Sequence, residues 1–234
     1  MNTPQNNLPP SIIGRLRSEL GLKLILLALL NLWVYVPYLY LQQHHFFPAT
    51  NLPAGFIDRL IPFSDQMVWP YLSIYLLMPV GPFLMTNRRR LLQYAAGIVL
   101  ISLFADLIFL FWPTTCPRSA LPSANAAYQT LTRIDNSFHA CPSLHAAFAI
   151  YSALCGSLVL GEFRGGRLWQ TGVWLWALLI LYATLATKQH VLVDIAAGSA
   201  LGFGIYGCVF DVRISIFKRK SLAHAVVGDQ STNL

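Results

Sequence analysis

The sequence has little charge, and acidic residues are especially scarce. Only 11% of its 234 residues are charged and 9 are Asp or Glu, whereas 56% are hydrophobic. Soluble domains carry about 25% charged residues, so this composition excludes an ordinary soluble domain. The apolar residues are gathered in blocks of about 20, the length that an α-helix needs to cross a bilayer. The sequence therefore predicts an integral membrane protein with one domain.

Three further features are missing. No stripe of Lys and Arg interleaved with aromatic residues accompanies the net charge of +7, so a nucleic-acid partner is not expected. The first ten residues are polar, and no small-residue cleavage site follows the first apolar block. This block is therefore expected to be an uncleaved signal anchor. No internal repeat is present, so a repeat architecture is not predicted.

Six apolar blocks predict an all-α, polytopic membrane fold with six transmembrane helices. Prolines and a glycine interrupt the second block, but helices within bilayers tolerate such residues. Short helices are expected in the two long outer loops, near 56–60 and over 124–134. Residues 1–220 form the predicted domain, and the polar tail at 221–234 is expected to be disordered. The predicted spans are Leu22–Leu41, Val68–Met85, Leu91–Trp112, Leu144–Leu160, Leu168–Thr187 and Val191–Phe210.

The Lys and Arg residues predict the orientation of these helices. Three lie before or at the start of the first span, three between the second and third, two between the fourth and fifth, and four follow the last. Only four of the 16 lie on the other side. The positive-inside rule then places both termini in the cytoplasm. The small size and short loops suggest a bacterial inner membrane, with the start of the fourth and sixth spans facing the periplasm.

A first polar motif, Cys141-Pro142-Ser143-Leu144-His145, stands at the start of the fourth span. Proline suits the beginning of a helix, where its missing N–H is not needed. Ser143 and the unpaired N–H groups of the first helical turn predict a phosphate-binding site, aided by the helix dipole. His145 falls in the same turn, where it can act as a proton donor.

A second polar motif precedes the last span and contains His190 and Asp194. Residues four apart lie on one face of a helix, so the carboxylate is expected to contact the imidazole. A carboxylate that holds the proton on one ring nitrogen leaves the other nitrogen free to attack. A single histidine at a membrane interface is usually structural, whereas two with such helpers predict catalysis.

The sequences Pro142-Ser143-Leu144-His145 and His190-x3-Asp194-x3-Gly198 resemble the second and third signature motifs of the type 2 phosphatidic acid phosphatase superfamily. They look most like the branch that includes inositol phosphorylceramide synthases. The resemblance implies that His190 is the nucleophile and forms a phosphohistidine, and that Asp194 orients it. It also implies that His145 protonates the leaving oxygen and that Ser143 binds phosphate oxygens. No metal or other cofactor is implied.

Two basic residues of the family pattern are missing. In the first motif Arg118 stands as the phosphate-binding arginine, but Phe111 occupies the position of the lysine. In the third motif Thr184 replaces an arginine. A phosphoryl group needs cations to stabilise the charge on its oxygens. Lys188 is therefore the expected substitute, together with Arg118.

These observations favour a membrane enzyme that hydrolyses lipid phosphate or pyrophosphate monoesters. A lipid phosphotransferase that passes the phosphoryl or phospho-headgroup to an acceptor alcohol is an alternative with the same chemistry. A non-catalytic lipid-binding or metal-binding membrane protein, the latter using His139, His145 and His190, is an alternative of another class. The substrate headgroup and the oligomeric state are left open.

Cys116 and Cys141 lie at the two ends of the second outer loop. If this loop faces an oxidising compartment, the two cysteines are expected to form a disulfide.

Overall fold

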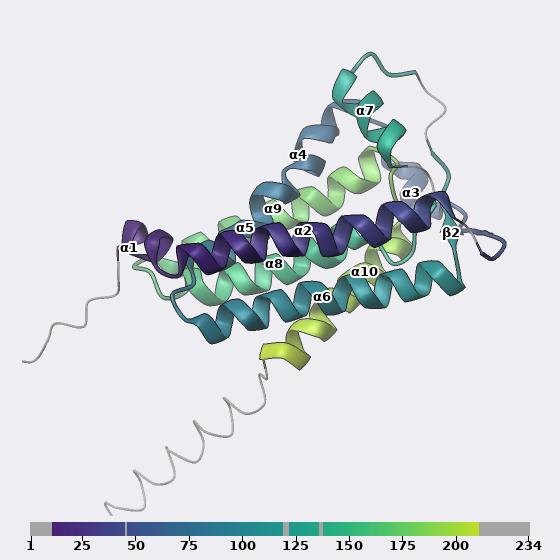
Figure 1. Cartoon of the computed structure of the whole chain (residues 1–234). Coiled ribbons are helices and arrows are strands. Elements are labelled where there is room, and N and C mark those ends of the chain that lie inside the picture. The colour runs from purple at the N-terminus through teal and green to yellow at the C-terminus, as the bar shows by residue number, and fades with distance from the viewer. Residues whose placement is uncertain (1–10, 45, 119–121, 136–137, 211–234) are drawn as a thin grey trace, which may run out of the picture.

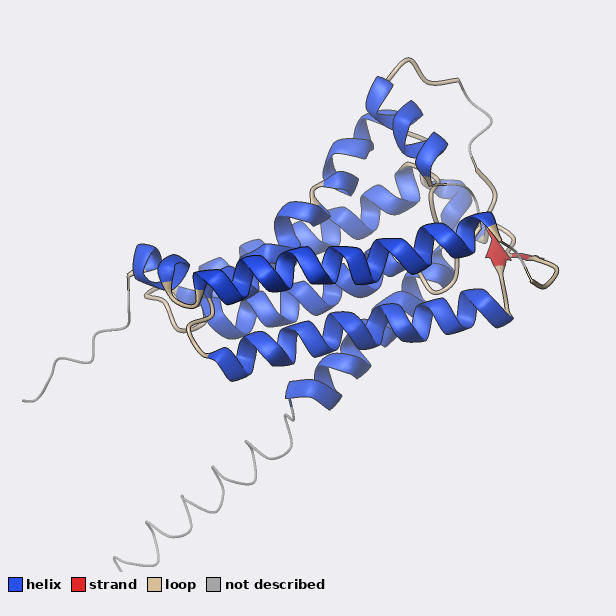
Figure 2. Ribbon diagram, viewed as in Figure 1, coloured by secondary structure: helices blue, strands red, loops and turns tan. Residues whose placement is uncertain are grey.

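The computed structural model describes residues 11–44, 46–118, 122–135 and 138–210. It is mostly helical, which confirms the all-α prediction (Figures 1 and 2). Residues 211–220 of the predicted domain and the tail at 221–234 lie outside the described residues. The elements are α1 (Ile12–Arg17), α2 (Leu20–Gln43), β1 (Thr50–Asn51), α3 (Phe56–Leu60), η1 (Asp65–Met67), α4 (Val68–Leu72), α5 (Ile74–Leu84), α6 (Arg88–Phe111), β2 (Thr114–Thr115), α7 (Ala126–Ile134), α8 (Leu144–Leu160), α9 (Gly166–Ala186) and α10 (Leu192–Phe210).

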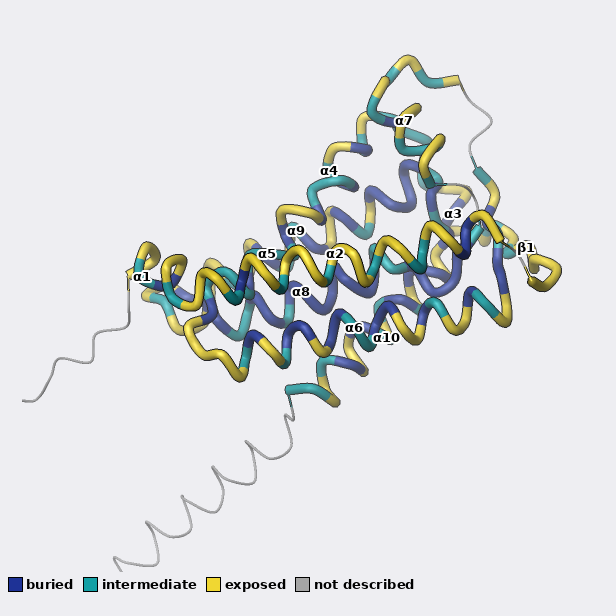
Figure 3. Tube along the Cα trace, in the orientation of Figure 1, coloured by how far each residue is buried: buried dark blue, intermediate teal, exposed yellow. Residues whose placement is uncertain are grey.

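The helix α8 is at the centre of the bundle, and α5, α9 and α10 pack around it. Most of α8 is buried, whereas α2 is largely exposed (Figure 3). Small residues along α8 and its neighbours allow close contact between helix backbones. A Cβ added at Gly81 on α5 would lie 3.2 Å from the backbone nitrogen of Gly156 on α8. The C-terminal half of α8 is therefore packed closely against α5.

Five helical segments have the length and composition of membrane spans, so the chain is a multi-pass membrane protein. They are Leu20–Gln43, Asp65–Leu84, Arg88–Phe111, Gly166–Ala186 and Leu192–Phe210. The remaining predicted span, α8, has the predicted bounds but only 17 residues. Because its neighbours surround it, α8 contacts protein along most of its length. The count of six spans is confirmed only for these five, and the sixth stays a prediction.

The two outer loops are joined at one end of the bundle. The short strands lie at this end of the molecule (Figure 2). β1 and β2 pair in parallel, with Thr50 opposite Thr114. The helix α3 has the predicted bounds, and α7 begins two residues later than expected because Asn125 caps it. The Tyr128 hydroxyl of α7 donates to the carbonyl oxygen of Thr187 at 3.1 Å. These contacts fasten the loops over the start of α8 and α10.

The helix α1 and the start of α6 lie at the opposite end of the bundle (Figure 1). The Glu162 carboxylate, between α8 and α9, pairs with Arg15 at 2.9 Å and Arg90 at 2.6 Å. Burial alone would raise the pKa of Glu162, but the hydrogen bonds from Arg90 and Arg15 lower it below its usual value. Which membrane face this end occupies stays a prediction.

Candidate active site

The first polar motif forms the N-terminus of α8. Ser143 is the N-cap, and its side-chain oxygen accepts a hydrogen bond from the backbone N–H of Ala146 at 3.3 Å. Pro142 precedes the cap, so it lies just before the first turn. Ser143 is fully buried and His145 is the second residue of the helix. The predicted helix start is confirmed, and phosphate binding by Ser143 stays a prediction.

The second motif brings His190 and Asp194 together, although His190 lies just before α10 rather than within it. Nδ1 of His190 is 3.4 Å from Oδ2 of Asp194, which is ion-pair distance without hydrogen-bond alignment. The same carboxylate oxygen accepts a hydrogen bond from the Val191 N–H at 3.1 Å. Asp194 is fully buried, so this N–H fixes the carboxylate beside the imidazole.

A backbone hydrogen bond joins the two motifs directly. The Ser143 N–H donates to the backbone carbonyl of Asp194 at 3.1 Å. Gly198, one helical turn later, lies so close to α8 that an added Cβ would be 2.2 Å from the Ser143 carbonyl oxygen. The rings of His145 and His190 are 6.5 Å apart between centroids. The two imidazoles can therefore act on a single phosphoryl group held between them.

His145 also contacts a polar cluster that sequence reasoning missed. The Tyr71 hydroxyl is 3.2 Å from Nδ1 of His145, and the two rings stack at 4.0 Å. The Tyr71 hydroxyl also lies 3.5 Å from Oδ2 of Asp135. Oδ1 of Asp135 accepts hydrogen bonds from Tyr38 at 2.8 Å and Gln42 at 2.7 Å. The scarcity of acidic residues was a usable signal for Asp135, but Tyr71 belongs to no motif.

The two predicted phosphate-binding cations occupy different surroundings. The Arg118 guanidinium donates to the backbone carbonyl of Asp135 at 3.4 Å, which places its charge beside the His145 cluster. The Lys188 ammonium instead donates to the backbone carbonyls of Asp58 at 2.8 Å and Ile61 at 2.5 Å. Lys188 therefore fastens the turn before His190 to the loop that carries α3.

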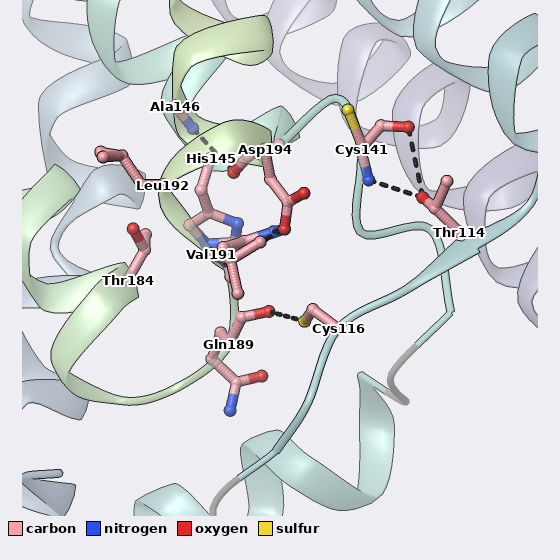
Figure 4. A network of polar contacts seen from close by, with 12 residues as sticks. Thr114, Cys116, Cys141, His145, Ala146, Thr184, Gln189, Val191, Leu192 and Asp194 are labelled. Carbon is pink, nitrogen blue, oxygen red and sulfur yellow. Dashed lines mark hydrogen bonds and ion pairs between the residues drawn. The ribbon is translucent and has the colours of Figure 1, made fainter. Parts of the chain in front are cut away.

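The predicted disulfide is wrong for this structure, in which Cys116 and Cys141 are both free. The Cys116 thiol donates to the Gln189 carbonyl at 3.0 Å (Figure 4). The Cys141 N–H donates to Thr114 Oγ1 at 2.8 Å. Hydrogen bonds thus link the loop to both motifs without a covalent bond. Burial raises the pKa of the Cys116 thiol to about 12 and that of Cys141 to about 11.

A cavity of about 320 Å³ opens onto both histidines. Its walls are mainly apolar side chains of α2, α4, α5, α6 and α8. It extends from His145, His190 and Asp135 at one end to Lys23 at the other. Ligand pockets commonly combine apolar walls with a few convergent polar groups, as this one does.

No group of three or more His, Cys, Asp or Glu residues that could hold a metal occurs among the described residues. His139, one of the three histidines of the metal-binding alternative, stacks on Phe109 with centroids 4.7 Å apart. The alternative therefore gains no support from the arrangement of these side chains.

The fold and the site define a multi-pass membrane protein with paired histidines at the end of an apolar cavity. The family model of the PAP2 superfamily matches residues 39–208, and the chain belongs to this superfamily. Its members are generally phosphatases or phosphotransferases, which supports an enzyme of this broad kind. The narrower resemblance to inositol phosphorylceramide synthases is not confirmed. No curated protein and no solved structure matches the chain significantly.

Proposed function

We propose that this protein is a lipid phosphatase that hydrolyses phosphate or pyrophosphate monoesters through a phosphohistidine. The observation that carries the proposal is the facing pair of His190 and His145, of which only His190 has a buried carboxylate beside it. A nucleophile needs one ring nitrogen bare and the other protonated, and Asp194 is placed to accept the proton on Nδ1. His190 is therefore assigned as the nucleophile and His145 as the acid.

The reaction proceeds in two steps. Nε2 of His190 attacks phosphorus while His145 gives a proton to the departing alkoxide or phosphate oxygen. Asp194 stabilises the positive charge that develops on His190. Water then loses a proton to His145 and attacks the phosphohistidine, releasing inorganic phosphate and restoring His190. No atom of a cofactor is needed in either step.

The phosphate oxygens would lie at the N-terminus of α8. Free N–H groups of the first turn and the helix dipole favour an anion there. The Ser143 hydroxyl, which accepts from Ala146, keeps its own proton for a phosphate oxygen. Arg118 is proposed as the principal cation because its guanidinium lies next to the His145 cluster. Lys188 is assigned a supporting role because two carbonyls already hold its ammonium.

The cavity supports a lipid as the substrate. Its apolar walls suit a hydrocarbon chain, while the histidines at its end would meet the headgroup. Along α2 it extends from Lys23 to Leu39, about 24 Å at 1.5 Å per residue. A single leaflet of the hydrocarbon core is about 15 Å thick, so the cavity is long enough for a full lipid chain.

A lipid phosphotransferase is the second candidate, and the enclosure of the site favours it. The side chain of His190 is only 10% exposed, and the cavity beside it is apolar. An acceptor alcohol carried on a lipid could reach the phosphohistidine through this cavity more readily than water. For either activity we propose a bacterial inner membrane, which the small size and short loops suggest. The site is proposed to face the periplasm because of the distribution of Lys and Arg residues.

The proposal is tested by rapid quench of the purified protein with labelled lipid phosphate. A phosphoenzyme that is labile to acid and stable to base is expected, and His190→Ala should abolish it. The matched control is His44→Ala, because His44 is at the same end but its ring stacks on Tyr40, away from the site. Persistence of the phosphoenzyme in His190→Ala would reassign the nucleophile. Following phosphate release and new lipid products together distinguishes hydrolysis from transfer.

A further inference from the structure

His145 has one occupied nitrogen and one open nitrogen. Nδ1 faces the Tyr71 hydroxyl at 3.2 Å, whereas Nε2 is buried without a hydrogen-bond partner among the described residues. His145 lines the cavity, where the reacting group would lie. A histidine that alternates between acid and base must keep the same nitrogen directed at the substrate. The contact at Nδ1 therefore decides which tautomer the reaction meets.

We propose that Tyr71 and Asp135 are positioning residues that form a chain with His145, so that Nδ1–H of the imidazole donates to Tyr71 and Tyr71 donates to Asp135. The proposal rests on the proposed function for the role of His145 as acid and base. These hydrogen bonds keep the proton on Nδ1, so Nε2 is unprotonated when the imidazole is neutral and protonated when it is charged. The chain gives His145 a distant carboxylate, as His190 has a direct one in Asp194.

The surrounding elements hold each member of this chain. Tyr71 lies on α4, is fully buried, and stacks flat on the imidazole at 4.0 Å. Asp135 caps the C-terminus of α7, and its other oxygen already accepts hydrogen bonds from Tyr38 and Gln42 on α2. Two donors on Oδ1 leave Oδ2 to accept from Tyr71. The separation of 3.5 Å is long for a hydroxyl, and catalytic hydrogen bonds often tighten only when substrate binds.

The proton balance gives the chain a role in both steps. In the first step the imidazolium gives its Nε2 proton to the leaving oxygen. The proton on Nδ1 stays on the ring and keeps its hydrogen bond to the Tyr71 hydroxyl. In the second step the bare Nε2 takes the proton of water or an acceptor alcohol as its oxygen attacks phosphorus. Asp135 stabilises the imidazolium that exists before the first step and after the second. The titratable and charged groups that act on the ring are Tyr71, Asp135 and His190. Those that act on its partner Tyr71 are Asp135, Tyr38, Tyr75 and Arg118.

Two substitutions test the chain without removing the imidazole. Tyr71→Phe keeps the stacked ring but removes the hydroxyl. Asp135→Asn keeps the shape, but its amide donates to Tyr71, reverses the chain and favours the wrong tautomer. General acid catalysis contributes about 10²–10⁴-fold, so each variant should lose about tenfold or more with dioleoyl phosphatidic acid. With p-nitrophenyl phosphate, whose leaving group needs no proton, the loss should be much smaller. The alkaline limb of the kcat/KM profile should move to lower pH in Asp135→Asn.

The matched control is Tyr151→Phe. This buried hydroxyl donates to the carbonyls of Gln93 and Tyr94, and its residue is not among those that line the cavity. It should lower stability while leaving the pH profile and the ratio between the two substrates unchanged. Equal losses on both substrates in Tyr71→Phe, or an unchanged pH profile in Asp135→Asn, would overturn the proposal.

A second readout separates this inference from the proposed function. Histidine ¹⁵N spectra of the full chain, assigned with His145→Ala, should show His145 protonated at Nδ1 in the wild type. Tyr71→Phe should show a mixture of tautomers. This result would support the hydrogen-bonded chain of His145, Tyr71 and Asp135 even if no phosphoenzyme forms. An unchanged tautomer in Tyr71→Phe would overturn it even if the phosphoenzyme is found.

Discussion

The close approach of α10 to α8 at Gly198 makes a quantitative prediction possible. In Gly198→Ala the new Cβ would lie 2.2 Å from the Ser143 carbonyl oxygen and 3.0 Å from its carbon. Ordinary contacts begin near 3.4 Å, so the two helices must move apart by more than about 1 Å. The obstacle is the backbone of the N-cap of α8 rather than a side chain that can rotate away.

This separation would act on both stability and catalysis. Overpacking of this kind costs about 1–3 kcal/mol. The displacement also lengthens the hydrogen bond of 3.1 Å from the Ser143 N–H to the Asp194 carbonyl, which joins the two motifs. Because a misplacement of about 1 Å can cost 10²-fold in rate, we expect Gly198→Ala to lose about 100-fold in kcat/KM.

Activity and thermal unfolding in one detergent measure the two effects. Gly204→Ala on the same helix is the matched control, because a Cβ there meets nothing within 4 Å. It should keep its activity, and its Tm should be unchanged or higher since Ala favours helix. Wild-type activity and Tm in Gly198→Ala would refute the packing described for α8 and α10, as would equal damage in Gly204→Ala.

Three further predictions concern the cations, the cysteines and the cavity. Arg118→Gln should lose about 2–4 kcal/mol of transition-state stabilisation, measured as kcat/KM, whereas Lys188→Gln should mainly lower Tm. The reverse pattern would make Lys188 the phosphate-binding cation and Arg118 the structural one. Cys116 and Cys141 should be found as thiols by mass spectrometry, and because burial raises the pKa of both, alkylation at pH 8 should require unfolding. A disulfide in protein isolated from its native compartment would contradict this. Leu30 lies in the middle of the cavity wall, so Leu30→Trp should reduce turnover of dioleoyl phosphatidic acid more than that of dioctanoyl phosphatidic acid. An equal effect on both substrates would show that the cavity does not bind the hydrocarbon chain of the lipid.

The sequence by itself determined the class of the protein and predicted the candidate site residues. The paucity of charge and the long apolar blocks predicted helices in a membrane, because the bilayer leaves few other structures possible. His145, His190 and Asp194 could be predicted as candidate site residues because their motifs are local, with spacings that follow from the geometry of a helical turn. The same locality allowed the bounds of α3 and α8 to be predicted correctly.

Only the tertiary structure decided how distant segments meet. Tyr71 and Asp135 are 74 and 10 residues from His145 along the chain, and no periodicity connects them to it. Lys188 was placed near the phosphate by its position beside His190, but carbonyls of the α3 loop hold its ammonium. Such contacts depend on loop closure and helix packing, which the order of residues does not reveal. The partners of a side chain are set by what packs against it, and that is a property of the folded bundle.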